Sequence, residues 1–210
     1  MSFLSRQDAG QKLARHLLNE GIGVDVVIGL PRGGVIVASE VAHALQRPLG
    51  VLVVRKIGHP MHREFAVGAL AENDVILLNE RIIANETVRA ELSEVIDEEK
   101  ERLAQYRRKF QVQKTDLCDK AVLIVDDGLA TGTTMEAAVL SARRQGAKKV
   151  MIAVPVGSAS AIEKLQRVAD AVIAIIADPG LEAVGAYYES FPQTDDDEVV
   201  SVLQAEHAHH

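Results

Sequence analysis

Short apolar runs alternate along the chain with segments of helical spacing. The apolar runs, each of a length that suits one buried strand, are Val24–Leu30, Leu49–Val54, Ala121–Val125, Val150–Pro155 and Ala171–Ile176. The segments with helical spacing are Val35–Leu45, Thr133–Gln145 and Ala159–Val168. Ser5 followed by Asp8 is an N-cap signal for an earlier helix. Apolar strands with helices between them predict an α/β fold with a mostly parallel, doubly wound sheet.

Two segments do not follow this alternation. Within Ile57–Asn79, the apolar runs Ala66–Leu70 and Val75–Leu78 could pair as a hairpin. Asn85–Phe110 has the apolar stripe of one charged helix, about 40 Å long at the usual rise per residue. Two interpretations stay open for that helix: a lid or dimer-forming excursion, or a plain covering helix. We expect a single domain over residues 1–210, with a lid or helical excursion at about 57–115.

Composition narrows the classes of partner. The net charge of −7 argues against a protein that coats nucleic acid or an anionic membrane. A single cysteine, Cys118, fits a reducing compartment. The opening residues lack the pattern of a signal peptide, and no apolar run approaches the ~18 residues of a membrane span. We therefore expect a cytoplasmic protein that binds small molecules, with neither nucleic acid nor membrane as a partner.

The segment Val122–Thr134 combines a buried strand, two acids and a helix start. Asp126 and Asp127 follow the strand at its C-terminal end, where open α/β sheets bind ligands. The small residues from Ala130 onward let the backbone close round a tetrahedral anion, which the free N–H groups and dipole of the first helical turn favour. Hydroxyl donors in this stretch are Thr131, Thr133 and Thr134.

The two carboxylates beside the anion site require an explanation, because negative side chains that faced a phosphate would repel it. Asp126 and Asp127 make sense if they accept hydrogen bonds from hydroxyls, or reach a Mg²⁺ ion indirectly. A vicinal diol with a phosphate is a ribose 5-phosphate, so the segment predicts a site for a phosphorylated sugar with Mg²⁺ as cofactor. The chain contains neither a Walker-type G-x-x-x-x-G-K-[ST] motif nor a G-x-G-x-x-G turn.

The sequence VLIVDDGLATGTT at Val122–Thr134 resembles the signature of the type I phosphoribosyltransferases, which bind 5-phosphoribosyl-1-pyrophosphate (PRPP). Gly128 departs from it, because the family usually has an aliphatic residue there. Upstream, GLPRGG at Gly29–Gly34 resembles the family's pyrophosphate loop, and Val54–Gly58 resembles the next strand end. Glu64–Gly68 falls where the family has a mobile catalytic loop.

This resemblance implies displacement of pyrophosphate from C1 of PRPP by a nitrogen nucleophile, with inversion and with Mg²⁺. The implied catalytic residues are Asp126, Asp127, Arg55 and Lys56. The implied PRPP-binding residues are Arg32, Gly33, Gly34, Ala130, Thr131, Gly132, Thr133 and Thr134. We also expect a homo-oligomer. Two alternatives stay open: a PRPP-sensing regulator without turnover, and a phosphoribosyl enzyme that uses phosphate or water as nucleophile.

The acceptor is expected to bind under a hood that the family builds at about residues 177–210. Acceptor residues implied there are Val184, Tyr187 and Tyr188, and the tyrosines or Phe191 could stack on a ring or anchor the C-terminal segment. Enzymes for 6-oxopurines carry an acid at the position of Ala130 and a Lys on the next strand. Here Val150–Val156 has no Lys. Ala130 and the run Arg55–Gly58 resemble the adenine-type enzymes instead.

Overall fold

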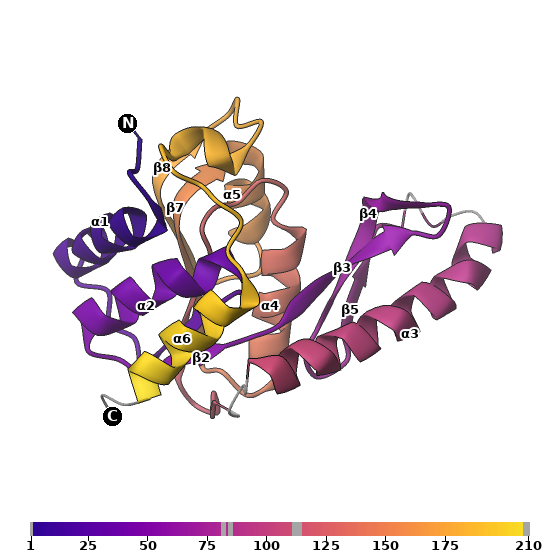
Figure 1. Cartoon of the computed structure of the whole chain (residues 1–210), viewed down its shortest axis with the longest axis horizontal. Coiled ribbons are helices and arrows are strands. Elements are labelled where there is room, and N and C mark those ends of the chain that lie inside the picture. The colour runs from indigo at the N-terminus through magenta and orange to yellow at the C-terminus, as the bar shows by residue number, and fades with distance from the viewer. Residues whose placement is uncertain (1, 81–82, 84–85, 111–114, 208–210) are drawn as a thin grey trace.

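The computed structural model describes residues 2–80, 83, 86–110 and 115–207, and its strands form two sheets (Figure 1). The larger sheet has the order β2-β1-β6-β7-β8, and every pair in it is parallel. Its strands are β1 (Val26–Gly29), β2 (Leu49–Val51), β6 (Ala121–Val125), β7 (Lys149–Ser158) and β8 (Ala171–Asp178). The predicted parallel α/β sheet is therefore confirmed.

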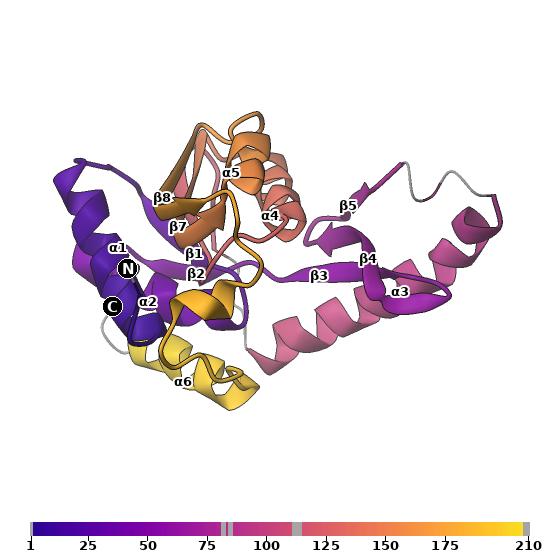
Figure 2. The ribbon, with the colours of Figure 1, turned by 90° about the horizontal axis from the view of Figure 1, so that it is seen from above.

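Helices cover both faces of this sheet, as Figure 2 shows from above. The helices are α1 (Arg6–Asn19), α2 (Gly33–Leu45) and α6 (Asp196–His207) on one face, and α4 (Thr133–Arg144) and α5 (Ala159–Leu165) on the other. Successive strand residues point to opposite faces, so Val122 packs toward α4, whereas Leu123 packs toward α1 and α2. The predicted start of α1 is confirmed, because Ser5 Oγ accepts the N–H of Asp8.

The smaller sheet is antiparallel and has the order β3-β4-β5. Its strands are β3 (Val54–His59), β4 (His62–Ala71) and β5 (Val75–Leu78), and α3 (Glu86–Lys109) packs along it. These four elements, here called the arm, extend away from the main sheet (Figures 1 and 2). The predicted hairpin is confirmed, with Gly68 opposite Leu78 and Ala71 opposite Val75.

The long helix α3 covers the arm's own sheet rather than the main one. Leu92 and Val95 of α3 are buried against Ile57 and Leu70 of the arm. Just beyond the end of α3, Phe110 is buried in the core of the main sheet. A covering role is therefore confirmed, and a role as a lid or a dimer contact stays a prediction. In the described part of the chain, no helix is long and apolar enough to cross a membrane.

The predicted strand Leu49–Val54 is divided between the two sheets. β2 ends at Val51, and Val54 already belongs to β3. Between them the N–H of Val53 is bonded at 3.0 Å to a carboxylate oxygen of Glu72 instead of to a neighbouring strand. The apolar run predicted burial of Leu49–Val53 correctly, but the chain leaves the main sheet after Val51 and enters the arm at Val54.

The expected mobile loop at Glu64–Gly68 is instead part of strand β4. Gly68 lies opposite Ile57 and Ala66 opposite Gly58 in the ladder with β3. The connection between the two strands contains only Pro60 and Met61. The expectation of a loop is wrong because the residues after Ala66 have a core of their own to fill, where Val67 and Leu70 are buried under α3.

Candidate active site

The candidate site lies where the strand order of the main sheet reverses. β2 is placed on one side of β1 and β6 on the other, with Gly29 opposite Val125 at their C-terminal ends. In open α/β sheets, the crevice at such a reversal is the usual position for a ligand. The turns after β1 and β6 both open into it, and they are the two segments with the strongest sequence motifs.

The turn from β6 into α4 presents backbone N–H groups. Gly132 is the N-cap residue of α4, and no side chain caps the helix there. Its φ of 74° lies in the left-handed region that favours glycine. The turn is fixed from behind, because Ser158 Oγ donates to the carbonyl of Ala130 at 2.7 Å. The first turn of α4 therefore begins with N–H groups that no side chain caps, and the binding of an anion there stays a prediction.

The turn borders a cavity of about 480 Å³, here called the main cavity. Its walls come from four separate parts of the chain and comprise Pro31, Val54–Lys56, Asp126, Gly128–Gly132, Thr134, Met135 and Val184. Of the predicted site residues, the structure thus brings together Asp126, Arg55, Lys56, Ala130, Thr131, Gly132, Thr134 and Val184. Thr133 begins α4 but does not line the main cavity.

A second cavity, of about 450 Å³, adjoins the main one and shares Pro31 and Asp126 with it. It is lined by Arg6, Arg32, Gly33, Asp127 and Phe191–Thr194 in addition. Pro31, in the turn after β1, borders both cavities, and its peptide bond to Arg32 is cis. Arg32 and Gly33 line the second cavity, whereas Arg55 and Lys56 line the main one.

The two acids pack directly against the glycines that begin α2. A side chain at Gly33 would place its Cβ 2.1 Å from Asp127 Oδ2, and one at Gly34 would lie 2.6 Å from Asp126 Oδ1. Glycine is required at both positions because the carboxylates fill this space. Burial, together with the neighbouring charge of Asp127, raises the pKa of Asp126 well above its ordinary range. Asp126 is thus the acid whose charge the site stabilises least.

Arg6 is a member of the site that sequence reasoning missed. Its Nε lies 2.7 Å from Asp127 Oδ2, and its Nη1 donates to the carbonyl of Pro192 at 2.7 Å. Its guanidinium also lies over the ring of Phe191, at 3.8 Å from the centroid. Burial raises the pKa of Asp127, and Arg6 opposes that shift. No local pattern marks Arg6, which follows an N-cap serine far from the acids in sequence.

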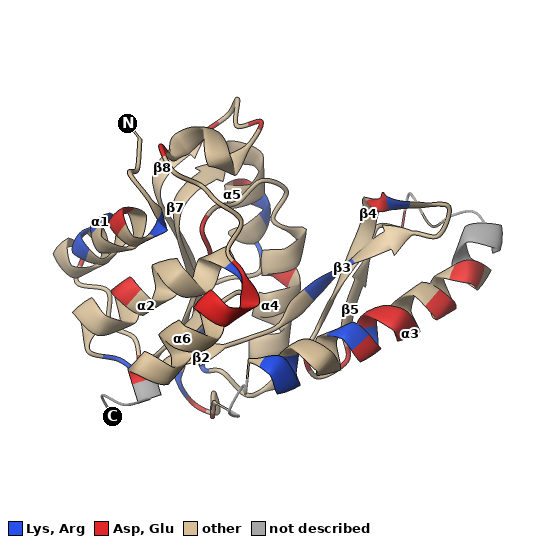
Figure 3. Ribbon diagram, viewed as in Figure 1, with Lys and Arg blue, Asp and Glu red and all other residues tan. Residues whose placement is uncertain are grey.

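Two of the three predicted cations, Arg55 and Arg32, are paired with acids from other elements. Arg55 Nε donates to Glu99 Oε2 of α3 at 2.9 Å. Arg32 Nη1 lies 3.7 Å from Asp196 Oδ1 at the start of α6, and the other oxygen of Asp196 is 2.7 Å from Lys109 Nζ. Figure 3 shows a basic position on β3, acidic residues along α3 and a basic end to that helix.

Val184 explains the departure of Gly128 from the family signature. It begins a short 3₁₀ helix, η1 (Val184–Tyr187). A Cβ at Gly128 would lie 2.4 Å from Val184 Cγ1. The volume that an aliphatic side chain at position 128 would need is therefore already occupied by Val184, which lines the main cavity in its place.

The expectation that Tyr187 or Tyr188 stacks on an acceptor ring needs correction. Tyr188 is 7% exposed, packs between the rings of Phe3 and Phe191, and donates its hydroxyl to the carbonyl of Asp127 at 2.7 Å. Burial raises its pKa above the ordinary range. The Tyr187 hydroxyl donates to the carboxylate of Asp178. Both rings anchor the C-terminal segment, the alternative given above, and neither lines the main cavity.

Comparisons with known proteins agree with this geometry. A family model for the phosphoribosyl transferase domain matches residues 4–188. A Mycobacterium tuberculosis protein with the provisional name phosphoribosyl transferase is 41% identical over an alignment of 210 positions that covers 98% of this chain and 47% of that protein. An amidophosphoribosyltransferase of Haemophilus influenzae is 30% identical over 146 residues, 69% of this chain and 22% of that enzyme. The chain thus spans half or less of the length of these curated relatives.

A crystal structure of a protein from Thermus thermophilus matches the fold with a TM-score of 0.79 and 39% identity, and covers 98% of this chain and 99% of that one. The family model spans both motif-bearing turns and most of the main sheet. The anion-binding turn and the paired acids lie at the reversal of strand order within this matched region. The chain therefore belongs to the phosphoribosyl transferase domain family.

Proposed function

We propose that this site transfers a phosphoribosyl group from PRPP to a nitrogen nucleophile and releases pyrophosphate. The observation that carries the proposal is the main cavity, because a helix N-terminus, a carboxylate and two cations all border it. PRPP bears a phosphate at one end of its ribose and a diphosphate at the other. The helix N-terminus suits the phosphate, the carboxylate suits the ribose hydroxyls, and the cations suit the diphosphate.

The 5-phosphate would bind at the first turn of α4. Thr131 and Thr134 border the main cavity there, and the uncapped N–H groups after Gly132 supply further donors. The ribose hydroxyls would meet Asp126. Asp127 already accepts a hydrogen bond from Arg6 and lines the second cavity rather than the main one, so we assign it the role of holding the acid pair in place. Both aspartates would favour positive charge on the sugar ring as the bond to pyrophosphate breaks.

The diphosphate would lie between the turn after β1 and strand β3. Gly33 and Gly34 begin α2 just after Pro31, with a second set of helix N–H groups, and Pro31, Arg55 and Lys56 line the main cavity. Positive charge at this position stabilises the leaving group as its charge develops. The adjoining Arg32 would act from the second cavity.

Mg²⁺ would bind together with PRPP rather than at a site formed by protein side chains alone. Among the residues that the structure describes, no cluster of three His, Cys, Asp or Glu side chains could hold a metal ion. Mg²⁺ usually keeps several waters and binds through one or two carboxylates plus substrate phosphates, and Asp126 and Asp127 would supply those carboxylates. When bound, the ion would neutralise charge on the diphosphate.

The acceptor is proposed to be a nitrogen compound other than a 6-oxopurine. None of the described residues that line the main cavity is aromatic, and β7 carries no Lys within Val150–Val156. A 6-oxopurine would leave its ring carbonyl and N–H unpaired by side chains there, at about 1–3 kcal/mol for each buried group. Of the three acceptor residues implied by the sequence, Val184 is the one that we retain.

The test is the release of pyrophosphate from PRPP and Mg²⁺, measured with adenine, hypoxanthine, guanine, uracil, orotate and ammonia as acceptors. We expect release with at least one acceptor, and the lowest kcat/KM for hypoxanthine and guanine. Asp126→Asn is the control for contaminating activity. Binding of PRPP without release for any acceptor would favour a PRPP-sensing protein instead, and release with water or phosphate alone would favour the third alternative. A cytoplasmic location and a homo-oligomer remain predictions.

A further inference from the structure

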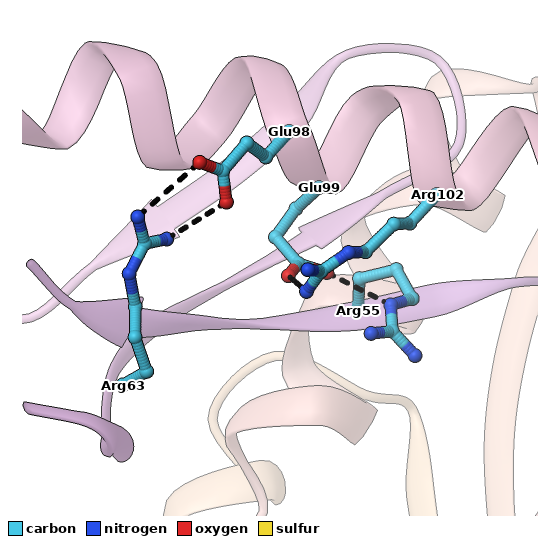
Figure 4. A network of polar contacts seen from close by, with 5 residues as sticks. All are labelled: Arg55, Arg63, Glu98, Glu99 and Arg102. Atoms are coloured by element: carbon cyan, nitrogen blue, oxygen red, sulfur yellow. Dashed lines mark hydrogen bonds and ion pairs between the residues drawn. The ribbon is translucent and has the colours of Figure 1, made fainter.

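Helix α3 of the arm contacts a residue of the main cavity through one buried acid, Glu99. Glu99 is 5% exposed, although it lies on a helix whose other acids are mostly at the surface. Its Oε2 accepts from Arg55 Nε at 2.9 Å, and its Oε1 accepts from Arg102 Nη1 at 2.6 Å. Figure 4 shows Glu99 between the two guanidinium groups. A buried carboxylate shared by two arginines in this way keeps both in a fixed arrangement.

The neighbouring acid on the same helix provides a contrast. Glu98 pairs with Arg63 through two hydrogen bonds of 3.1 and 3.3 Å, and both side chains are more than 40% exposed. Exposed pairs of this kind contribute little, because water and salt screen them. Figure 4 shows the two pairs one beside the other. Only the Glu99 pair includes a residue that lines the main cavity, namely Arg55.

The guanidinium group of Arg55 is hydrogen-bonded through Nε, and its two terminal nitrogens remain available. Among the described residues, its hydrogen bonding uses Nε alone. Its guanidinium carbon also lies 5.1 Å from the centroid of the Tyr106 ring on α3. In Figure 4 the two terminal nitrogens of Arg55 point away from Glu99 and from the helix. A planar guanidinium with both terminal amino groups available can bind a phosphate through two parallel hydrogen bonds.

We propose that Glu99 is a positioning residue that holds Arg55 so that its terminal amino groups meet the diphosphate of PRPP. The proposal rests on the proposed function, because it needs a diphosphate on this side of the cavity. The charges agree with it: Glu99 balances one of its two arginines, which leaves one net positive charge in the Arg55–Glu99–Arg102 group. The long helix would then act on the site as well as cover its own sheet.

The test compares the two ends of the substrate in one binding assay. Calorimetry would measure the Kd of magnesium pyrophosphate and the Kd of ribose 5-phosphate for the wild type, for Glu99→Gln and for the matched control Glu98→Gln. Glu99→Gln keeps the size of the side chain and removes its charge, so Arg55 loses its ionic partner. We expect its Kd for pyrophosphate to rise about tenfold and its Kd for ribose 5-phosphate to stay within about twofold. Glu98→Gln should change neither.

A double-mutant cycle separates positioning from a general structural role. In an Arg55→Gln background, Glu99→Gln should not weaken pyrophosphate binding further, because its effect passes through Arg55. An equal loss for both ligands, no loss for either, or a further loss in the Arg55→Gln background would overturn the proposal. If Glu99→Gln does not fold, Glu99→Asp is held to the same criteria. A wild type that binds neither ligand would instead contradict the proposed function, so the two failures are distinguishable.

Discussion

The phosphate side of the main cavity is made from one continuous segment, whereas its cationic side is assembled from distant parts of the chain. Asp126 through Thr134 follow one another from the end of β6 into α4. Arg55 comes from the arm and is hydrogen-bonded to Glu99 of α3, and Arg32 comes from the turn after β1 and is paired with Asp196 of α6. The first side is continuous in sequence, although Ser158 and Arg6 support it from outside the segment. The second side requires the arm and the C-terminal helix to be packed.

Changes on the phosphate side should therefore act locally and strongly. Gly132→Val should lower the affinity for ribose 5-phosphate by about 100-fold or more, measured by calorimetry. The residue has φ of 74°, and a Cβ would lie 3.2 Å from Leu165 Cδ1 rather than in the cavity. The sequence alone suggests that valine would fill the space of the anion. The structure indicates instead that it would displace the backbone whose N–H groups bind the anion.

Gly146→Val is the matched control for Gly132→Val. Gly146 follows the other end of α4, has φ of 85°, and would place a Cβ 3.3 Å from Cys118 Sγ. Both variants should lose about 1–2 kcal/mol of stability from the strained backbone, visible as similar falls in Tm. An equal loss of ligand affinity in the two variants would show that strain alone, and not the turn, accounts for the effect.

The second prediction concerns the acid pair. Asp126→Asn should weaken PRPP binding by about 100-fold, because hydrogen bonds to a charged group contribute about 1.5–3 kcal/mol each. The same variant should unfold at a higher temperature than the wild type at neutral pH. The pKa of Asp126 is raised in the fold by burial and by Asp127, so its charge destabilises the folded state. Unchanged PRPP affinity would exclude a ribose-binding role for Asp126.

Asp127→Asn should behave differently from Asp126→Asn. It would leave Arg6, whose side chain is 10% exposed, without its ionic partner, and such a loss costs about 3–5 kcal/mol in a buried pair. A lower Tm together with weaker PRPP binding is therefore expected. If Asp127→Asn proved as stable as Asp126→Asn, the assignment of Arg6 as the residue that holds the pair would be incorrect.

The third prediction is a pH dependence with a definite sign. In the proposed function the ionised form of Asp126 accepts the ribose hydroxyls, so PRPP affinity should fall about tenfold per pH unit once the pH is below the raised pKa of Asp126. For stability the sign is opposite. In the unfolded chain an Asp loses its proton above pH ~3.9, whereas Asp126 in the folded state keeps its proton to a higher pH. The contribution of Asp126 to the free energy of unfolding is therefore full at low pH and is lost as the pH rises through its folded pKa. Titration of Tm and Kd for wild type and Asp126→Asn would separate the two.

The smallest predicted effect tests the contact between the phosphate side and the hood. Gly128→Ala would place a Cβ 2.4 Å from Val184 Cγ1, and overpacking of this kind costs about 1–3 kcal/mol. Val184→Ala should restore most of the lost Tm, because it removes the atoms in conflict. A double variant no more stable than Gly128→Ala would mean that the conflict lies elsewhere.

The sequence predicts the two sides of the cavity unequally for a physical reason. Residues that are adjacent in sequence determine an apolar strand, and they also determine a glycine-containing turn between strand and helix. The parallel sheet and the β6–α4 turn can therefore be predicted from the sequence. Arg6 and Glu99 act through partners 121 and 44 residues away, and nothing in their local sequence marks that contact. The same limit explains why Leu49–Val54 was expected as one strand, since the carboxylate of Glu72 that divides it belongs to another part of the chain.

The sequence also does not determine which residues of the hood face a ligand. Tyr187, Tyr188 and Phe191 form an aromatic cluster that the sequence identifies, but clustering does not tell whether rings face a ligand or the core. The hydroxyl contacts with Asp178 and with the backbone of Asp127 decide that question. Val184, which has no distinctive chemistry, is the hood residue that lines the main cavity.

The most direct test of the central claim is a crystal structure of the protein with PRPP and Mg²⁺. We expect the 5-phosphate at the first turn of α4, the ribose hydroxyls at Asp126, and the diphosphate between the start of α2 and the terminal amino groups of Arg55. A PRPP molecule bound in the reverse direction, or bound away from the C-terminal ends of β1 and β6, would contradict the proposed function.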